Sequence, residues 1–215
     1  MSTERIIPTP HGEGRLVTDR ARHTLATLLV SHGAGGGIES RDLEALARHL
    51  PRHGITVVRF EQPWRRAGRK IATPPATLDA GLRSAADNLR GRVPLVVGGR
   101  SAGARSAVRT AHLLGAVGCL ALSFPLHPPG RPEKSRVEEL RASRLPTLVI
   151  QGERDAMGGP DEFPSSTELC VVPAADHGLK VLARAEISQE EAMGIVVEAT
   201  LEWIVREVTG NSSAR

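Results

Sequence analysis

The amino-acid sequence predicts an α/β protein with a mostly parallel, twisted sheet and helices on both faces. Apolar runs of strand length alternate along the chain with segments of helical spacing, which is the pattern of such sheets. The chain has 215 residues, enough to bury a full core and within the range of one α/β domain. We therefore expect a single domain over residues 1–210 and a flexible polar tail at 211–215.

The expected elements follow from apolar runs, turn residues and helical periodicity. Proline and glycine in the segment 51–54 end the first helix, and Ala192, Ile195, Val196, Ala199 and Ile204 give the last helix its apolar face. A basic loop follows the strand at 55–60. In order, the elements are a β hairpin at 6–19, a strand at 24–31, a helix at 40–50, a strand at 55–60, a helix at 77–90, a strand at 93–98, a helix at 104–114, a strand at 119–124, a short helix at 136–142, strands at 147–150 and 169–172, and a helix at 189–208.

A glycine-flanked serine joins the strand at 93–98 to the helix that follows it. The pentapeptide at 99–103 reads Gly-Arg-Ser-Ala-Gly and fits G-x-S-x-G, the turn that exposes a nucleophilic serine between a strand and a helix. Small residues two positions either side of Ser101 allow the backbone to turn that sharply. Ser101 is therefore the candidate nucleophile.

An acid and a histidine follow in the chain order that this kind of site requires. Asp155 comes after the strand at 147–150, and His177 comes after the strand at 169–172. Because loops at the carboxyl ends of parallel strands meet at one edge of a sheet, these residues are expected near Ser101. Glu153 and Asp161 are alternative acids; His127 and His32 are alternative histidines.

The segment Ser31-His32-Gly33-Ala34-Gly35 is expected to supply part of an oxyanion hole. A tetrahedral intermediate carries negative charge on the former carbonyl oxygen, so the site needs two preorganised N–H donors. We assign one donor to the backbone of Ala102 and the other to Ala34 or Gly35. His32 is expected to fix this loop through its side chain.

Three further residues are candidates for contact with substrate. His127 follows the strand at 119–124 and either shapes the pocket or is held by its neighbouring prolines. Arg65 and Arg66 follow the strand at 55–60, and their guanidinium groups suit a carboxylate or a phosphate, although a solvated loop would have the same composition.

Together these segments resemble one group of enzymes. The segments SHGAGGG, RFEQPWR, GGRSAGAR, FPLHPPGRPEK, VIQGERDAMGG and ADHGLK are similar to those of small α/β-hydrolases of the dienelactone-hydrolase-like group. The narrower resemblance is to the family that includes testis-expressed protein thirty and a subunit of the non-specific-lethal histone acetyltransferase complex. It extends from about residue 26 to residue 205 and implies an α/β-hydrolase fold with Ser101, Asp155 and His177 as nucleophile, acid and base. It also implies that some relatives act as complex subunits.

The sequence thus predicts a serine hydrolase of esters or thioesters that works through an acyl-enzyme. A non-catalytic interaction module of the same fold and a peptidase-type hydrolase are the alternatives. The segment between residues 124 and 147 is too short for a large lid, so the site should be open to small or extended acyl substrates. The mechanism requires no metal and no organic cofactor. G-x-x-x-x-G-K-[ST] and G-x-G-x-x-G both fail here on residue identity.

Composition excludes several other classes. The net charge of +4 is compatible with anionic partners, but aromatic residues make up only 2% of the chain, so no platform for stacking nucleic-acid bases is visible. No apolar stretch approaches the length of a membrane span, and the start of the chain lacks a signal-peptide pattern, which predicts a cytoplasmic protein. Cys119 and Cys170 lie in apolar runs and are expected to be buried, reduced thiols.

Overall fold

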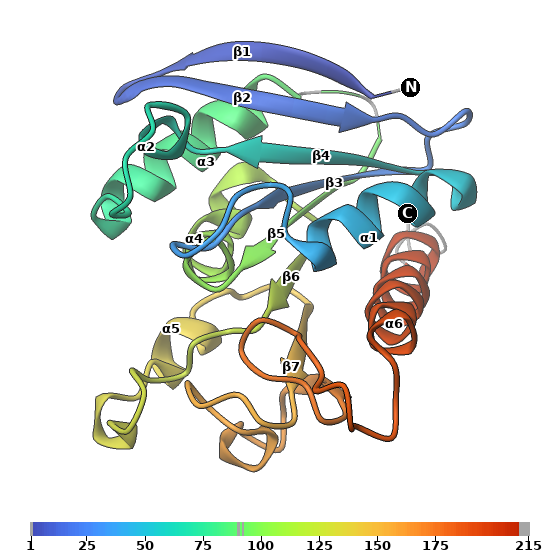
Figure 1. The fold of residues 1–215 in the computed structure, drawn as a ribbon. Helices are drawn as coiled ribbons and strands as arrows, with labels where there is room; N and C mark the ends of the chain where they lie inside the picture. The colour runs from blue at the N-terminus through green and yellow to red at the C-terminus, as the bar shows by residue number, and fades with distance from the viewer. Residues whose placement is uncertain (1, 90, 92, 211–215) are drawn as a thin grey trace.

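An eight-stranded sheet forms the centre of the molecule (Figure 1). The computed structural model describes residues 2–89, 91 and 93–210, so the expected tail at 211–215 lies outside the described residues, as does the last residue of the helix expected at 77–90. The strands are β1 (Thr3–Thr9), β2 (Gly12–Asp19), β3 (Ala26–Ser31), β4 (Ile55–Glu61), β5 (Leu95–Arg100), β6 (Gly118–Leu122), β7 (Thr147–Gly152) and β8 (Glu168–Val172). The α/β fold class predicted from the sequence is confirmed.

The strand order is β1-β2-β4-β3-β5-β6-β7-β8. The hairpin of β1 and β2 is antiparallel and packs antiparallel to β4, whereas β4, β3, β5, β6, β7 and β8 are mutually parallel. All the carboxyl ends of these six strands therefore lie at one edge of the sheet, where the loops after β3, β5, β7 and β8 can meet.

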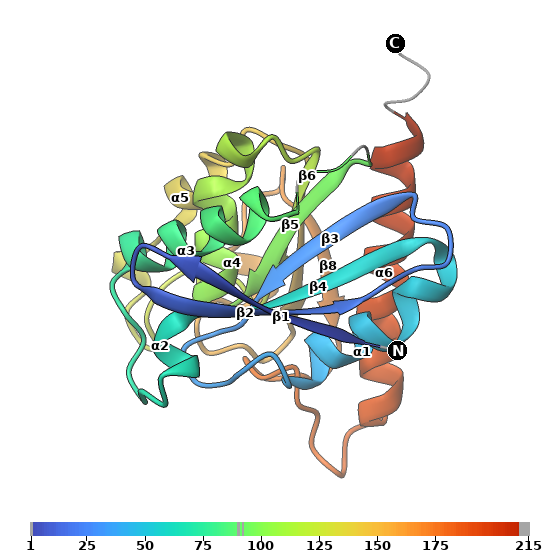
Figure 2. The ribbon, with the colours of Figure 1, turned by 90° about the horizontal axis from the view of Figure 1, so that it is seen from above.

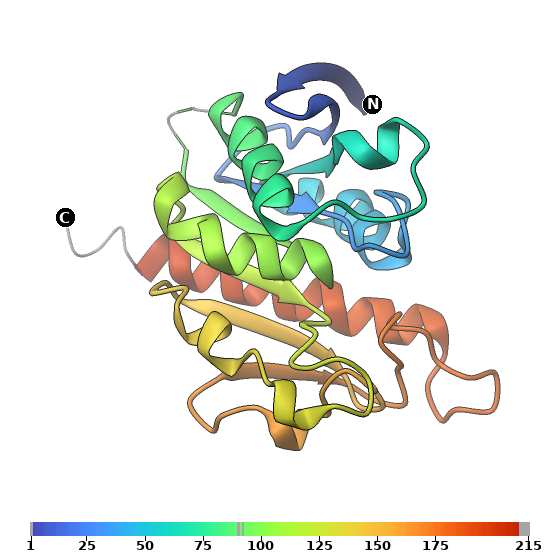
Figure 3. The same ribbon diagram turned by 90° about the vertical axis from the view of Figure 1, so that its left-hand side faces the viewer.

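Helices cover both faces of the sheet (Figures 2 and 3). They are α1 (Arg41–His49), α2 (Pro63–Arg66), α3 (Pro75–Asp87), α4 (Ala102–Thr110), α5 (Val137–Arg141) and α6 (Gln189–Gly210). Successive residues of β3 point to opposite faces: Leu28 and Val30 pack in the core under α1 and α6, and Leu29 packs in the core under α3 and α4. Burial of alternating aliphatic residues on both faces thus makes two cores around one sheet.

The structure differs from the sequence-based expectation by one additional short helix and at the ends of several elements. The basic loop after β4 contains α2, which begins with Pro63 at its first position, where the missing N–H costs nothing. β6 stops at Leu122 because Ser123 has φ 47°, which is incompatible with a strand. α4 stops at Thr110 and continues as a 3₁₀ turn to Leu114, ended by Gly115 at φ 69°.

The two cysteines are in different surroundings. Cys119 is fully buried, and burial raises the pKa of its thiol to about 12. Cys170 lies on the edge strand β8 and is only half-buried, so the expectation that both thiols are buried was wrong for this one. Both are free thiols. Among residues 2–89, 91 and 93–210, no helix has both the length and the apolarity that crossing a bilayer would need.

Candidate active site

Ser101 lies in a strained turn between β5 and α4. Its backbone has φ 52° and ψ −112°, a conformation that an L-residue rarely adopts, and its N–H donates to the carbonyl of Leu122 at 2.9 Å. A Cβ on Gly99 would lie 2.5 Å from the carbonyl carbon of Gly103, and one on Gly103 would lie 2.4 Å from the carbonyl oxygen of Ser31. Glycine at both positions therefore lets strand, turn and helix pack closely enough to expose the serine.

The structure brings Ser101, His177 and Asp155 together. His177 Nε2 lies 2.9 Å from Ser101 Oγ, and His177 Nδ1 lies 2.7 Å from Asp155 Oδ2. Because the carboxylate oxygen accepts, Nδ1 carries the proton and Nε2 is free to accept the hydroxyl proton of Ser101. The arrangement can activate a serine hydroxyl by general base catalysis.

The two alternative acids, Glu153 and Asp161, have other surroundings than Asp155. Glu153 accepts a hydrogen bond from the backbone N–H of Ala174 at 2.6 Å and so fixes the start of the histidine loop, residues 173–180. Asp161 belongs to a 3₁₀ turn after β7 and is exposed. Asp176, next to His177, is exposed, and its Oδ1 accepts from the N–H groups of Gly178 and Lys180, which shapes the same loop.

Gln151 is part of the site, although the sequence analysis did not identify it. Asp155 is 4% exposed, and its carboxylate accepts from the Met157 N–H at 2.8 Å and from Gln151 Nε2 at 2.8 Å in addition to His177. Gln151 Nε2 also donates to the carbonyl of Gly158 at 2.8 Å. The sequence did offer a signal for Gln151: a glutamine that directly follows an apolar strand and precedes a candidate acid by four residues.

His32 fixes the loop after β3. Its Nε2 accepts from the backbone N–H of Gln62 at 3.1 Å, so its Nδ1 carries the proton and donates to the carbonyl of Gly33 at 2.8 Å. Burial lowers the pKa of His32, which agrees with a neutral ring. The ring also contacts Trp64, with centroids 5.5 Å apart. His32 therefore ties the loop after β3 to the end of β4.

The candidate oxyanion donors belong to two segments: the loop after β3, residues 32–37, called the oxyanion loop below, and the start of α4. A Cβ on Gly33 would be 3.1 Å from Ser101 Cβ, so the loop passes directly beside the serine. Ala34 and Gly35 follow in an exposed turn, and the space that a Cβ on Gly35 would enter is open. Ala102 begins α4, where the first N–H groups of a helix have no partner within the helix. The N–H groups of these two segments therefore stay the candidate donors for an oxyanion hole.

His127 is the first of the three residues that the sequence made candidates for contact with substrate. Both ring nitrogens of His127 are engaged, Nδ1 with the carbonyl of Pro128 at 2.8 Å and Nε2 with Glu162 Oε2 at 2.9 Å. Both partners are acceptors, so both nitrogens donate; the carbonyl bond first and then Glu162 raise the pKa of His127. His127 thereby joins the loop after β6 to the loop after β7.

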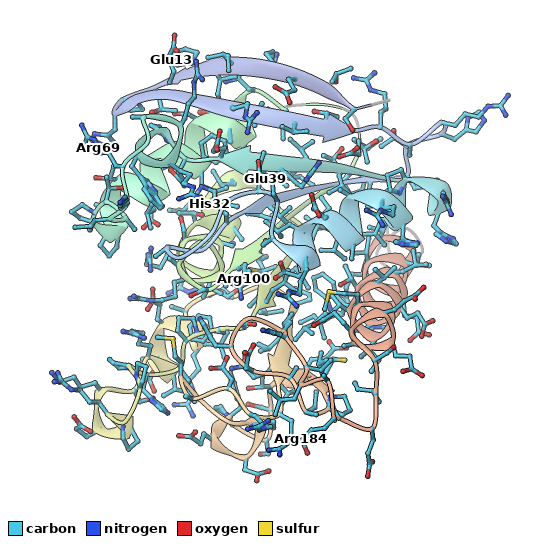
Figure 4. All side chains as sticks on the ribbon, viewed as in Figure 1. Glu13, His32, Glu39, Arg69, Arg100 and Arg184 are labelled. Carbon is cyan, nitrogen blue, oxygen red and sulfur yellow. The ribbon has the colours of Figure 1, made fainter. Side chains whose placement is uncertain are left out.

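Arg65 lies beside the loop after β3, whereas Arg66 lies beside the β1–β2 hairpin. Arg65 Nε would lie 3.7 Å from a Cβ on Gly37, so Arg65 lies against the glycine-rich loop. Arg66 pairs with Glu13 of the hairpin at 3.0 Å and lines a groove of about 690 Å³ beside α2. Glu13 and Arg69, which also line this groove, lie well above Arg100 in Figure 4. Of the two arginines, Arg65 is the one beside the candidate oxyanion loop.

The described residues contain no group of three or more His, Cys, Asp or Glu side chains that could hold a metal ion.

Comparison with known proteins agrees with the fold of the chain. A family model described as an alpha/beta hydrolase domain matches residues 24–205. The chain is similar to XC6422 from Xanthomonas campestris, an a/b serine hydrolase without lid, with 22% identity, 94% of each chain covered and a TM-score of 0.70.

Two other solved structures are similar over almost their whole length. Dienelactone hydrolase from Anabaena variabilis has 18% identity and a TM-score of 0.73, with 96% of this chain and 97% of that chain covered. Est1E from Butyrivibrio proteoclasticus has 15% identity and a TM-score of 0.71, with 94% and 99% covered. At these identities the likeness shows a shared fold.

Proposed function

Because the chain belongs to the alpha/beta hydrolase domain family over residues 24–205, we propose that it is a serine hydrolase that cleaves carboxylic esters or thioesters. The observation that carries the proposal is the continuous relay from Ser101 Oγ through His177 to Asp155, with links of 2.9 Å and 2.7 Å. The first link is within the distance over which a general base accepts a proton, and the second is a hydrogen bond that can hold the imidazole.

In the acylation step His177 Nε2 takes the hydroxyl proton as Ser101 Oγ bonds to the substrate carbonyl carbon. Asp155 holds the imidazole in the tautomer that can accept this proton and stabilises the resulting cation. The negative charge that develops on the carbonyl oxygen is stabilised by the N–H of Ala102 and the N–H of Ala34 or Gly35. The positive end of α4 adds to this stabilisation.

The tetrahedral intermediate collapses by breaking the bond to the leaving group, which receives the proton from His177 and departs as an alcohol or a thiol. A water molecule then loses a proton to His177 and attacks the acyl-Ser101 carbonyl. Collapse of the second intermediate breaks the acyl–serine bond, returns the proton to Ser101 and releases the acid.

The substrate we propose is a small or extended acyl compound. The segment between β6 and β7 contributes only a 3₁₀ turn at 132–134 and α5, so little covers the edge of the sheet where the relay lies. Arg65, beside the glycine-rich loop, is the proposed contact for a negatively charged substrate group. The narrower kinship with the family of testis-expressed protein thirty, the cytoplasmic location, and the lack of nucleic-acid or membrane partners stay predictions.

Labelling with a fluorophosphonate probe tests the proposal. The probe should label the wild type at one position and spare Ser101→Ala. Ser106→Ala, which removes a serine of helix α4 that bonds to Asp79, should still be labelled. A folded wild type that takes no label would favour the interaction-module reading instead. Rates on a series of p-nitrophenyl esters, set against aminopeptide substrates, then separate an esterase from a peptidase.

A further inference from the structure

The residue before the candidate nucleophile, Arg100, has a side chain that turns into the protein. Its side chain is only 12% exposed, and in Figure 4 it lies near the middle of the molecule, below His32. Its Nη2 donates to the backbone carbonyl of His177 at 2.8 Å, and its Nε lies 3.0 Å from Asp42 Oδ2. Its Nη1 would be 3.4 Å from a Cβ on Gly33. One side chain thus contacts the histidine loop, helix α1 and the oxyanion loop.

Asp42 holds this guanidinium in place by its charge. Asp42 lies in α1 and is fully buried, and its other oxygen, Oδ1, accepts from the N–H of Leu43 at 3.0 Å. A buried carboxylate without a charged partner is strongly destabilising, so Arg100 is held against it. The pair is an ion pair rather than a hydrogen bond: Nε lies 3.0 Å from Oδ2 but outside hydrogen-bond geometry, so charge attraction keeps the guanidinium against α1, and Nη2 is left to donate elsewhere. It donates to the carbonyl of His177.

Arg100 anchors the middle of the histidine loop, whereas Glu153 and Arg154 hold its start and Gln189 holds its end at Leu179. Ala174 and Leu179, on either side of His177, have φ 56° and φ 49°, which persist only where the surroundings hold them. The bonds from Asp176 to Gly178 and Lys180 are internal to the loop, so they shape it without fixing it to the serine. The bond from Arg100 joins the loop to the strand that ends at Ser101.

We propose that Arg100 is a positioning residue: kept in place by its ion pair with Asp42, it holds the imidazole of His177 at bonding distance from Ser101. The proposal rests on the function proposed above for that relay. A lysine at position 100 would keep the charge beside Asp42, but a single ammonium cannot reproduce two contacts in fixed directions. Loss of Arg100 should therefore act on the orientation of the imidazole and, in the proposed reaction, on kcat more than on KM.

The experiment compares Arg100→Met and Arg100→Lys with Arg59→Met. Arg59 is a matched control, since its side chain is also 12% exposed and bonds to one carbonyl, that of Ile38 at 3.0 Å, and to one carboxylate, that of Asp19 at 3.3 Å. Long-range ¹H–¹⁵N NMR reports the tautomer of the His177 ring whether or not the protein hydrolyses anything, and initial rates on a p-nitrophenyl ester give kcat and KM.

The wild type and Arg59→Met should show the Nδ1–H tautomer, and both arginine-100 variants should show a mixture, with kcat lowered at least 10-fold and KM little changed. An unchanged tautomer in a folded Arg100 variant, or a mixed tautomer in the wild type, would overturn the proposal. Where Arg100→Met fails to fold, Arg100→Lys makes the comparison. A wild type that has the expected tautomer but no hydrolytic activity would refute the proposed function and leave the NMR comparison to decide the role of Arg100.

Discussion

Gly103 offers a direct way to disturb the candidate site without touching a reacting group. In the variant Gly103→Ala the new Cβ would lie 2.4 Å from the carbonyl oxygen of Ser31 and 2.7 Å from that of His32. Both are backbone atoms at the end of β3, which is held between β4 and β5. The contact with Ser31 must therefore lengthen from 2.4 Å to at least 3.0 Å by moving α4 away from the oxyanion loop.

Two opposing terms set the size of the effect on stability. Alanine gains about 1 kcal/mol over glycine inside a helix, whereas overpacking against structure that cannot move aside costs about 3 kcal/mol at the upper end of its usual range. We expect the free energy of unfolding of Gly103→Ala to fall by about 2 kcal/mol. Displacement of the serine from the oxyanion loop should lower kcat about 10²-fold, as misplacements of this order do.

Gly194→Ala is the matched control, because Gly194 lies in helix α6 and nothing is within 4 Å of the position of its Cβ. This variant should keep wild-type activity and gain up to about 1 kcal/mol in the free energy of unfolding. The assays are urea unfolding and initial rates on a p-nitrophenyl ester. If Gly103→Ala matched Gly194→Ala in both, the close packing of β3 on α4 would not be what positions the serine.

Three other predictions concern single groups. Asp155→Asn should lower kcat by about 10⁴-fold, since an amide favours the wrong imidazole tautomer; a loss below 10-fold in steady-state rates would contradict the role of the carboxylate. Glu162→Gln should lower the free energy of unfolding by about 0.5 kcal/mol between pH 5 and 6, because solvent screens a pair whose carboxylate side chain is 43% exposed. The pKa of His127 is raised, so the stability from its charged form is lost as the pH rises through its pKa in the folded protein. The pKa of Glu162 is lowered, chiefly by the Gly159 N–H, so the stability from its carboxylate is lost only at acid pH. If the stability difference between the wild type and Glu162→Gln grew from pH 6 to pH 9, the pairing would be refuted. Burial raises the pKa of Cys119 to about 12, so iodoacetamide at pH 8 should leave it unmodified in the folded protein, as mass spectrometry would show.

The sequence was informative wherever a local pattern decides the structure. Apolar runs located all the parallel strands, and the order of Ser101, Asp155 and His177 along the chain named the residues that the fold brings together. His32 could be assigned to its loop because the glycine-rich segment 33–37 follows it directly. Element ends were less predictable, since a 3₁₀ turn such as 111–114 has the composition of the helix that it extends.

Contacts between distant segments could not be predicted. The bond from Arg100 to His177 joins residues 77 positions apart, and the pair of Arg100 with Asp42 exists only because α1 packs beside the end of β5. The same holds for His127, whose second ring nitrogen meets Glu162, 35 residues further along. Arg65 and Arg66 are neighbours of one type, and only the packing of α2 on the hairpin directs Arg66 to Glu13.

Rapid mixing with p-nitrophenyl acetate tests the central claim, that Ser101 forms an acyl-enzyme, most directly. We expect a burst of about one p-nitrophenol per chain and an acetyl group on Ser101 in the peptide mass spectrum, and neither of these in Ser101→Ala. A wild type and a Ser101→Ala variant that released p-nitrophenol with the same time course would contradict it.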